Sequence, residues 1–297
     1  MNNWFIFAKE RFHLSSHLTL ILLFVGAHVA TAKMYKIESS PLVMGLVFLA
    51  MLVFFFKMRL YDEIKDYDLD VKINPNRPLP RGLVTLAEVK KGIVVCIVLE
   101  VALYAMIGIN PLLVLLFAIG YSLLMYKEFF IGKLIRPHLT TYAVMHTVVT
   151  VPMGLSMFSA LSGEMPDGMP QPLLLFALCN WPLFNIFEFG RKTFASEEER
   201  GQVESYSKIF GRHGAVILVI SMAVISLVIL NQMYGRIGVL QLGTLSLLII
   251  LGFYYSIKNT VKAGKIYRAF SSFYIVLFYV FYLLEILFLK DYPKLFL

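Results

Sequence analysis

Three aspartates recur at four-residue intervals in RLYDEIKDYDLD, residues 59–70, as Asp62, Asp66 and Asp70. Because an α-helix rises about 1.5 Å and turns about 100° per residue, each carboxylate lies about 6 Å beyond the last, on one face. Glu63 lies beside that face. Like charges stacked near a helix C-terminus are unfavourable unless a cation neutralises them. Oxygen-only ligands suit Mg²⁺, so these four acidic residues are candidate metal ligands.

The same run also fits a solvated helix end, in which Lys65 pairs with an aspartate, as most charged runs do. The next connection, NPNRPLPRG at residues 74–82, favours a binding site instead. Its three prolines fix an extended, ordered backbone that carries Arg77 and Arg81 back toward the carboxylates. Two guanidinium groups and a metal ion are suited to hold a diphosphate. The alternative for the two arginines is contact with lipid headgroups.

The elements that must position these residues are membrane-spanning helices. Of the 297 residues 59% are apolar and 15% are charged, which excludes an ordinary soluble protein. Apolar stretches long enough to cross a bilayer form nine predicted spans. The spans cover residues 17–36, 41–60, 86–108, 111–126, 138–160, 171–188, 213–233, 237–256 and 267–289. We therefore predict an all-α, polytopic integral membrane protein with a single domain over residues 1–297.

The positions of Lys and Arg predict the orientation, because cytoplasmic connections carry an excess of positive charge. When the first 16 residues and alternate connections are placed in the cytoplasm, 22 of the 27 basic residues lie there. The chain therefore starts in the cytoplasm and its acidic face opens there; in a bacterium the membrane is the inner, plasma membrane. The net charge of +8 follows from this topology and from contact with anionic lipid. We expect no nucleic acid partner.

The acidic run followed by NPNRPLPRG after a second span resembles the UbiA superfamily of intramembrane prenyltransferases. The first motif of that family reads N-x-x-x-D-x-x-x-D. Asp62 stands at its Asn position, Asp66 and Asp70 fall on its two aspartates, and Glu63 stands where many members have Asp. The resemblance implies nine helices around a central cavity open toward lipid. It also implies two Asp-rich motifs on the cytoplasmic side, which hold Mg²⁺ and a prenyl diphosphate.

The second family motif departs from its pattern in this chain. Members usually carry D-x-x-x-D at the end of the sixth span, where this chain has Glu188 and Lys192 in FEFGRK, residues 187–192. A lysine cannot bind Mg²⁺. A second metal is therefore either held by Glu188 with fewer protein ligands or replaced by direct contact of Arg191 and Lys192 with the diphosphate. We expect one well-held metal ion, with the two cationic side chains contributing to diphosphate binding.

The segment GQVESYSKIFG, residues 201–211, resembles the G-x-x-S/T loop that ends in glycine before the seventh span of the family. Ser205 and Lys208 are therefore candidate phosphate contacts. The acidic residues 197–199 before this segment fit a plain solvated loop.

The fourth span ends in YSLLMYK, where the family often places a tyrosine and a lysine. Tyr121, Tyr126 and Lys127 are therefore candidate substrate-binding residues, although an aromatic rim at the interface explains Tyr126 equally well. Polar groups inside spans either line a cavity or form helix–helix hydrogen bonds. Three such residues are Asn180, Asn185 and His146.

The resemblance implies an Mg²⁺-dependent prenyltransferase in which Asp62, Asp66, Asp70 and Lys192 act in catalysis. The metal bridges the diphosphate of an allylic prenyl donor and stabilises the leaving charge. A small lipophilic or aromatic acceptor, left unidentified by the residues, attacks the allylic carbon within the surrounding membrane lipid. No residue stands out as the base that removes its proton.

Two other functions compete with prenyl transfer. A transporter or metal-ion carrier would use the acidic face for cation binding, but such residues usually lie near the middle of the membrane on broken helices. Here they cluster at the cytoplasmic boundary. A CDP-alcohol phosphotransferase would need the pattern D-x-x-D-G-x-x-A-R, which is absent because no glycine follows Asp66.

Overall fold

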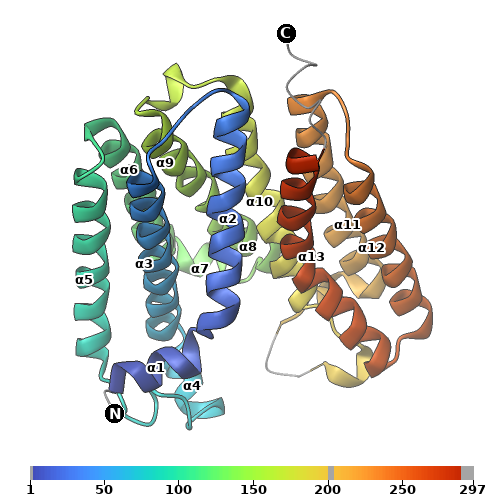
Figure 1. Cartoon of the computed structure of the whole chain (residues 1–297). Coiled ribbons are helices and arrows are strands. Elements are labelled where there is room, and N and C mark those ends of the chain that lie inside the picture. Colours follow the sequence, from blue (N-terminus) through green and yellow to red (C-terminus); the bar gives the residue numbers. More distant parts are fainter. Residues whose placement is uncertain (1–2, 200–203, 289–297) are drawn as a thin grey trace.

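The structure is a computed structural model that describes residues 3–199 and 204–288. Within those ranges it contains helices and turns but no strand. The long helices run side by side in two groups (Figure 1). One group contains α2, α3, α5, α6 and α9, the other contains α11, α12 and α13, and α10 packs against members of both. The predicted all-α membrane fold is confirmed.

Within the described residues, eight helical segments are long and apolar enough to cross a membrane. They are α2 (Leu14–Met34), α3 (Pro41–Lys65), α6 (Ile109–Tyr126), α8 and α9 together (Leu139–Thr147 and Thr150–Ser162), α10 (Gln171–Arg191), α11 (Tyr206–Tyr234), α12 (Val239–Lys258) and α13 (Val261–Phe288). The ninth predicted span is α5 (Leu86–Ala105), which packs against α3 and α6. Four charged residues make it less apolar than the others.

Short helices connect the long ones. They are α1 (Asn3–Arg11), α4 (Tyr67–Ile73), η1 (Glu128–Phe130), α7 (Gly132–Ile135), η2 (Pro166–Gly168) and η3 (Ser196–Glu198). The helices α1 and α4 lie together at the lower end of the bundle in Figure 1. This is the end at which α3 finishes, so it is also where the acidic face emerges from the apolar bundle.

The acidic face is formed by the junction of α3 and α4. The backbone N–H of Asp66 donates to the carbonyl of Asp62 at 2.9 Å, and that of Asp70 donates to Asp66 at 2.8 Å. These are the four-residue hydrogen bonds of an α-helix, so α4 continues α3 with only a local distortion at Asp66. The helix therefore extends beyond the apolar span, as the sequence predicts, and ends at Ile73.

The predicted span 138–160 is interrupted between α8 and α9. Pro152 has no backbone N–H and its ring would collide with the carbonyl of Val148, four residues earlier. The N–H of Val151 donates to that carbonyl instead, at 2.9 Å. The backbone of Val148 and Val149 stays right-handed helical, but its hydrogen bonds tighten to three-residue spacing, so α8 and α9 meet at a local distortion.

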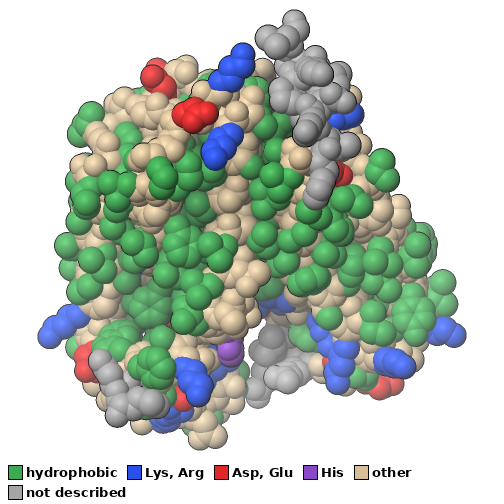
Figure 2. Space-filling model, in the orientation of Figure 1, with side chains coloured by type: hydrophobic (Ala, Val, Ile, Leu, Met, Phe, Trp, Pro, Cys, Tyr) green, Lys and Arg blue, Asp and Glu red, His purple; other side chains and the backbone are tan. Residues whose placement is uncertain are grey.

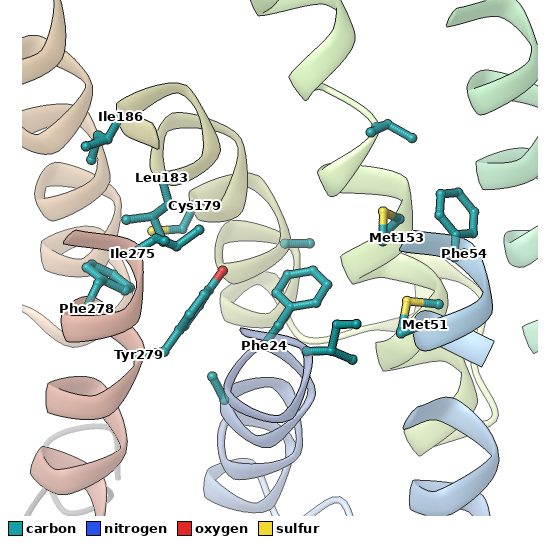
Figure 3. Packing of buried hydrophobic residues seen from close by; sticks show 14 of the residues in the cluster. Phe24, Met51, Phe54, Met153, Cys179, Leu183, Ile186, Ile275, Phe278 and Tyr279 are labelled. Atoms are coloured by element: carbon teal, nitrogen blue, oxygen red, sulfur yellow. The ribbon is translucent and has the colours of Figure 1, made fainter. Parts of the chain in front are cut away.

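The interior of the bundle is filled by side chains from α2, α3, α9, α10 and α13 (Figure 3). Because lipid is as apolar as these side chains, helix association depends on close packing and on interhelical hydrogen bonds. One such network links three helices. The hydroxyl of Tyr279 donates to Asn180 Oδ1 at 2.7 Å, and Asn180 Nδ2 lies 3.2 Å from His28 Nε2. Asn180 is thus a helix–helix contact, one of the two alternatives that its sequence position allows.

Candidate active site

A cavity of about 500 Å³ opens between α3, α8, α9 and α10. Figure 2 shows that the lower edge of the molecule is hollowed between its two groups of helices, with Lys and Arg side chains around the hollow. The charged or ionisable lining residues are Arg11, Arg59, Asp62, Lys65, Asp66, Arg77, Tyr142, His146, Glu188, Arg191 and Lys192. The remaining lining residues are Phe55, Met58, Met125, Ala143, Thr147, Val149, Thr150, Met153 and Phe184.

The order of these residues along their helices shows how the cavity is divided. On α3, Phe55 comes two turns before Asp62, and on α10, Phe184 comes one turn before Glu188. The apolar lining therefore lies deeper in the bundle, and the charged lining lies at the end that carries α1 and α4. Six Lys and Arg side chains face three carboxylates there, which leaves a positive excess suited to a multiply charged anion.

Two of the predicted metal ligands, Asp62 and Asp66, line the cavity. The Asp62 side chain is 52% exposed, and within the described residues it forms an ion pair with Arg59 alone, 3.9 Å away. The Asp66 carboxylate has neither a hydrogen bond nor an ion pair among those residues. Solvent reaches it, yet the protein around the cavity removes enough water to raise its pKa, and the charge of Asp70 acts in the same direction. A bound cation would offset both effects.

The other two predicted metal ligands are turned toward arginines. Asp70 is buried, and both of its carboxylate oxygens accept from Arg77 Nη1 at 2.6 Å. Glu63 is also buried, and its Oε1 accepts from Arg11 Nε at 2.7 Å and from Arg59 Nη2 at 2.5 Å. These two carboxylates therefore hold in place three of the arginines that line the cavity, and neither lines it itself.

The end of α10 carries the altered second motif. Glu188 accepts from Arg191 Nε at 2.7 Å and lies 2.9 Å from Lys192 Nζ. All three side chains line the cavity, on the wall opposite α3. The single acid of this motif is therefore neutralised by two neighbouring cations, whereas Asp66 forms no ion pair with any described residue.

Three predicted phosphate contacts lie away from the cavity. Arg81 pairs with Glu10 of α1 at 2.8 Å, which ties the proline-rich connection to the N-terminal helix. Ser205 is the N-cap of α11, where its hydroxyl accepts from the N–H of Lys208 at 3.0 Å. The Lys208 ammonium lies 3.4 Å from Glu204. None of the three lines the cavity within the described residues.

The expectation of a plain solvated loop is wrong for two of the residues in 197–199. Glu198 forms an ion pair with Arg268 of α13 at 2.6 Å, and Glu199 accepts from the hydroxyl of Ser207 at 2.6 Å. Arg268 also donates to the carbonyl of Thr193 at 3.1 Å. The connection after α10 is therefore fastened to α11 and α13, because acidic side chains meet partners that are distant in sequence.

The candidates at the end of α6 lie behind the cavity wall. The Tyr121 hydroxyl donates to the Met145 carbonyl of α8 at 2.7 Å. Tyr126 stacks on Tyr61, with ring centroids 4.7 Å apart, and the Lys127 ammonium lies 5.1 Å from the Tyr126 ring. These contacts join α6 to α3 and α8, and none of the three candidates lines the cavity in the described part of the chain.

Asn185 is buried one layer behind the lining. Its Oδ1 accepts from the hydroxyl of Thr147 at 2.9 Å, and its Nδ2 donates to the carbonyl of Trp181. Thr147 does line the cavity. Asn185 therefore orients a lining residue and joins α8 to α10.

The sequence pattern of the UbiA prenyltransferase family matches residues 19–282. The chain belongs to this family. Among solved structures, one described as digeranylgeranylglyceryl phosphate synthase in membranes is 18% identical and covers 92% of this chain and 98% of its own, with a TM-score of 0.59. The apo structure of a UbiA homolog from Aeropyrum pernix K1 is 17% identical, covers 90% and 97%, and has a TM-score of 0.58. No curated protein matches the sequence.

At these identities the two structures show the shared fold, and membership of the UbiA family supports prenyl transfer as the class of reaction. The predicted resemblance is confirmed. The family also places the protein among integral membrane proteins, in agreement with its apolar helices.

The donor groups of this UbiA-family protein suit a magnesium ion that arrives with its substrate. No group of three or more His, Cys, Asp or Glu in the described ranges is arranged to hold a metal ion by itself. Mg²⁺, however, is often bound by only one or two carboxylates, with waters and substrate phosphates as the other ligands. Asp62 and Asp66 provide that number of carboxylates beside an excess of cations.

Several lining residues were missed by the sequence reasoning. Arg59 comes three residues before Asp62 and seven before Asp66, so the helical period already placed it on the same face. Arg11 gave no such signal, because it reaches the site only through the packing of α1 against α3. Tyr142 and Thr147 lie on α8, and only the packing of the helices reveals that this helix forms a wall.

Proposed function

We propose that this UbiA-family protein transfers a prenyl group from an allylic prenyl diphosphate to a small lipophilic or aromatic acceptor, with Mg²⁺ as cofactor. The reaction takes place at the cytoplasmic side of the membrane, and residues 1–297 act as one transmembrane unit. The observation that carries this proposal is the carboxylate of Asp66, which has no partner in the described residues and lies in a cavity with six cationic side chains.

Asp62 and Asp66 are the residues that would hold the magnesium ion. When bound, the ion supplies positive charge to the diphosphate as negative charge develops on it. Arg77 binds and orients the diphosphate oxygens, and Asp70 fixes the direction of its guanidinium group. Arg11 also binds the diphosphate oxygens, and Glu63 fixes the direction of its guanidinium group. In this proposal Asp70 and Glu63 are positioning residues that act through arginines.

The apolar part of the cavity holds the prenyl chain. Phe55, Met153 and Phe184 line it on α3, α9 and α10. The allylic carbon becomes electron-poor as its bond to oxygen lengthens, and apolar walls keep water from attacking it. The acceptor can then reach this carbon from the membrane, since the cavity lies among helices that are surrounded by lipid.

The experiment uses the protein in lipid nanodiscs with Mg²⁺, geranyl, farnesyl and geranylgeranyl diphosphates, and a lipid extract as the source of acceptors. Prenylated products are detected by mass spectrometry. We expect Asp66→Asn to lower turnover by at least about a hundredfold, as loss of a group that stabilises developing charge does. Asp68→Asn is the matched control, because Asp68 is exposed, lies two residues further along the chain and does not line the cavity in the described part of the chain.

Two results would refute the proposal. One is full turnover by Asp66→Asn, which would remove the metal assignment. The other is a wild-type protein that neither binds nor consumes any of the three diphosphates. If that protein instead moved Mg²⁺ across a sealed vesicle membrane, the acidic face would serve a metal-ion carrier.

A further inference from the structure

His146 is a neutral nitrogen base in the wall of the cavity. Its Nδ1 lies 2.6 Å from the backbone carbonyl of Tyr142, on the same helix. A carbonyl oxygen only accepts, so Nδ1 carries the ring proton and Nε2 carries the lone pair. His146 lines the cavity, so this lone pair belongs to a group that a bound substrate can approach.

The lone pair of His146 is covered by a lysine. Lys65 Nζ lies 3.3 Å from Nε2, and an ammonium group only donates. Lys65 also lines the cavity, one residue from Asp66. The same ammonium group is therefore within reach of both the imidazole and the region where a diphosphate would bind.

The imidazole ring itself is held still. Tyr142 stacks on it with ring centroids 3.9 Å apart, and Phe129 of η1 meets it edge-on at 5.8 Å. The Tyr142 hydroxyl donates to Glu128 at 3.2 Å, and Arg136, directly after α7, pairs with Glu128 at 2.8 Å. The titratable groups around the ring are thus Lys65 and Tyr142, with Glu128 and Arg136 one contact further away. Among the described residues, Lys65 is the flexible side chain that contacts Nε2.

We propose that His146 accepts the proton that the acceptor loses, and that Lys65 covers Nε2 until a bound diphosphate draws its ammonium group away. The inference rests on the proposed prenyl transfer. Among the described lining residues, the other proton acceptors are already engaged: Asp62 and Asp66 face the metal and the diphosphate, and Glu188 is paired with two cations. The hydroxyl of Tyr142 is bound to Glu128.

The bond between the allylic carbon and the diphosphate oxygen breaks, and its electron pair leaves with the diphosphate. An oxygen or ring carbon of the acceptor forms the new bond to the allylic carbon. The proton on that acceptor atom passes to His146 Nε2, and after product release it passes to water at the open end of the cavity. Lys65 then returns to the neutral imidazole.

The exchange of Lys65 couples donor binding to proton removal. A diphosphate attracts an ammonium group more strongly than a neutral imidazole does, because the former is a charge pair. Departure of Lys65 frees the lone pair and removes a positive charge that would oppose an imidazolium ion 3.3 Å away. The base is therefore exposed only when the donor is in place.

The coupling is tested without knowledge of the acceptor. Nitrogen NMR of protein labelled at the rings of its six histidines reports the state of each Nε2, and His146→Gln identifies the His146 signals. We expect inorganic pyrophosphate with Mg²⁺ to shift the Nε2 signal of His146. Lys65→Met should place that signal near the shifted position before any ligand is added, and pyrophosphate should then move it little.

Calorimetry with the same ligand separates the two possible failures. If pyrophosphate binds and the His146 signals do not move, the coupling is overturned while the proposed function stands. If pyrophosphate with Mg²⁺ does not bind, the proposed function fails, and this inference is overturned together with it.

The role of the base is tested by turnover of the donor and lipid extract described above. His146→Ala should lower kcat by about a hundredfold to ten-thousandfold, the usual contribution of a general base. Pyrophosphate should bind this variant at least as tightly as the wild type, because Lys65 no longer has to leave the imidazole. Added imidazole should restore part of the rate. The control is His138→Ala, because His138 is exposed just before α8 and does not line the cavity. Undiminished turnover by His146→Ala, or a loss that imidazole leaves unchanged, would overturn the assignment.

Discussion

A buried ion pair joins α3 to α5 and allows a quantitative test of the fold. Lys57 Nζ lies 2.5 Å from Glu100 Oε2, and both side chains are fully buried. The ammonium group also lies 3.9 Å from the centroid of the Phe54 ring, whereas Glu100 Oε1 has no hydrogen-bond partner in the described residues. The perturbation is the pair of single variants Lys57→Met and Glu100→Leu, together with the double variant.

The structure predicts that the two single variants are unequal. Removal of one member of a buried pair costs about 3–5 kcal/mol, because the other charge is left without compensation. In Lys57→Met the carboxylate loses the one ion-pair partner that it has among the described residues, so we expect this variant to lose about 5 kcal/mol of stability, the upper end of that range. In Glu100→Leu the ammonium group keeps the Phe54 ring, which is worth about 2 kcal/mol when desolvated, so we expect the lower end, about 3 kcal/mol. The double variant should lie near the wild type.

The measurement is the free energy of unfolding of all four proteins in mixed micelles, titrated with a denaturing detergent. The double variant should be more stable than either single variant by at least about 2–3 kcal/mol, which is a large coupling for two residues in contact. Single variants within about 0.5 kcal/mol of the wild type would mean that water reaches the pair. A double variant as unstable as the two singles combined would refute the reasoning from desolvation.

Three further predictions concern the site and its connections. Asp70→Asn and Arg77→Met should each weaken pyrophosphate binding by about tenfold to a hundredfold, as loss of a charged hydrogen bond does, and the double variant should be no worse; calorimetry measures all three. Lys192→Asp should raise the number of Mg²⁺ ions bound with pyrophosphate from one to two, counted by the same method. The Glu198 carboxyl has a lowered pKa because Arg268 donates hydrogen bonds to it. The stabilisation that the Glu198–Arg268 pair contributes is therefore fully present above pH 4.5, the ordinary pKa of a glutamate. It is lost as the pH falls through the lower pKa of the folded protein. Limited proteolysis should detect release of this connection in acid, and Glu198→Gln should show that cleavage already at neutral pH.

The features that the sequence predicted well are those set by local geometry. The four-residue spacing of Asp62, Asp66 and Asp70 and the absence of a helix breaker were enough to predict a helix that extends beyond its span. Length and apolarity were enough to predict the spans. The interruption between α8 and α9 had a local cause as well, Pro152. Apolar length alone could not predict it, because one proline leaves the stretch as long and almost as apolar as before.

The partners of the acidic residues could not be predicted from spacing. Asp70 and Asp66 have the same residue type and the same helical face, yet Asp70 is buried against Arg77. Glu63 meets Arg11, which is 52 residues away in the chain. Such pairings depend on how α1 and the proline-rich connection pack beneath α3. Residue type therefore predicted where charge would gather, and only the fold decides which carboxylates remain open to a ligand.

The two walls of the cavity satisfy their charges in different ways, and this difference explains how a lysine can replace the family's second aspartate. On α3 the carboxylate of Asp66 has no hydrogen bond or ion pair in the described residues, so it remains open to a cation that arrives with the substrate. On α10, Glu188 already has two cations, Arg191 and Lys192. When a diphosphate binds, one cation can exchange Glu188 for a phosphate oxygen while the other stays paired with Glu188, so none of the charges is left without a partner. We therefore infer that the α10 wall binds the diphosphate directly and that Glu188 keeps two repelling cations close together until it does.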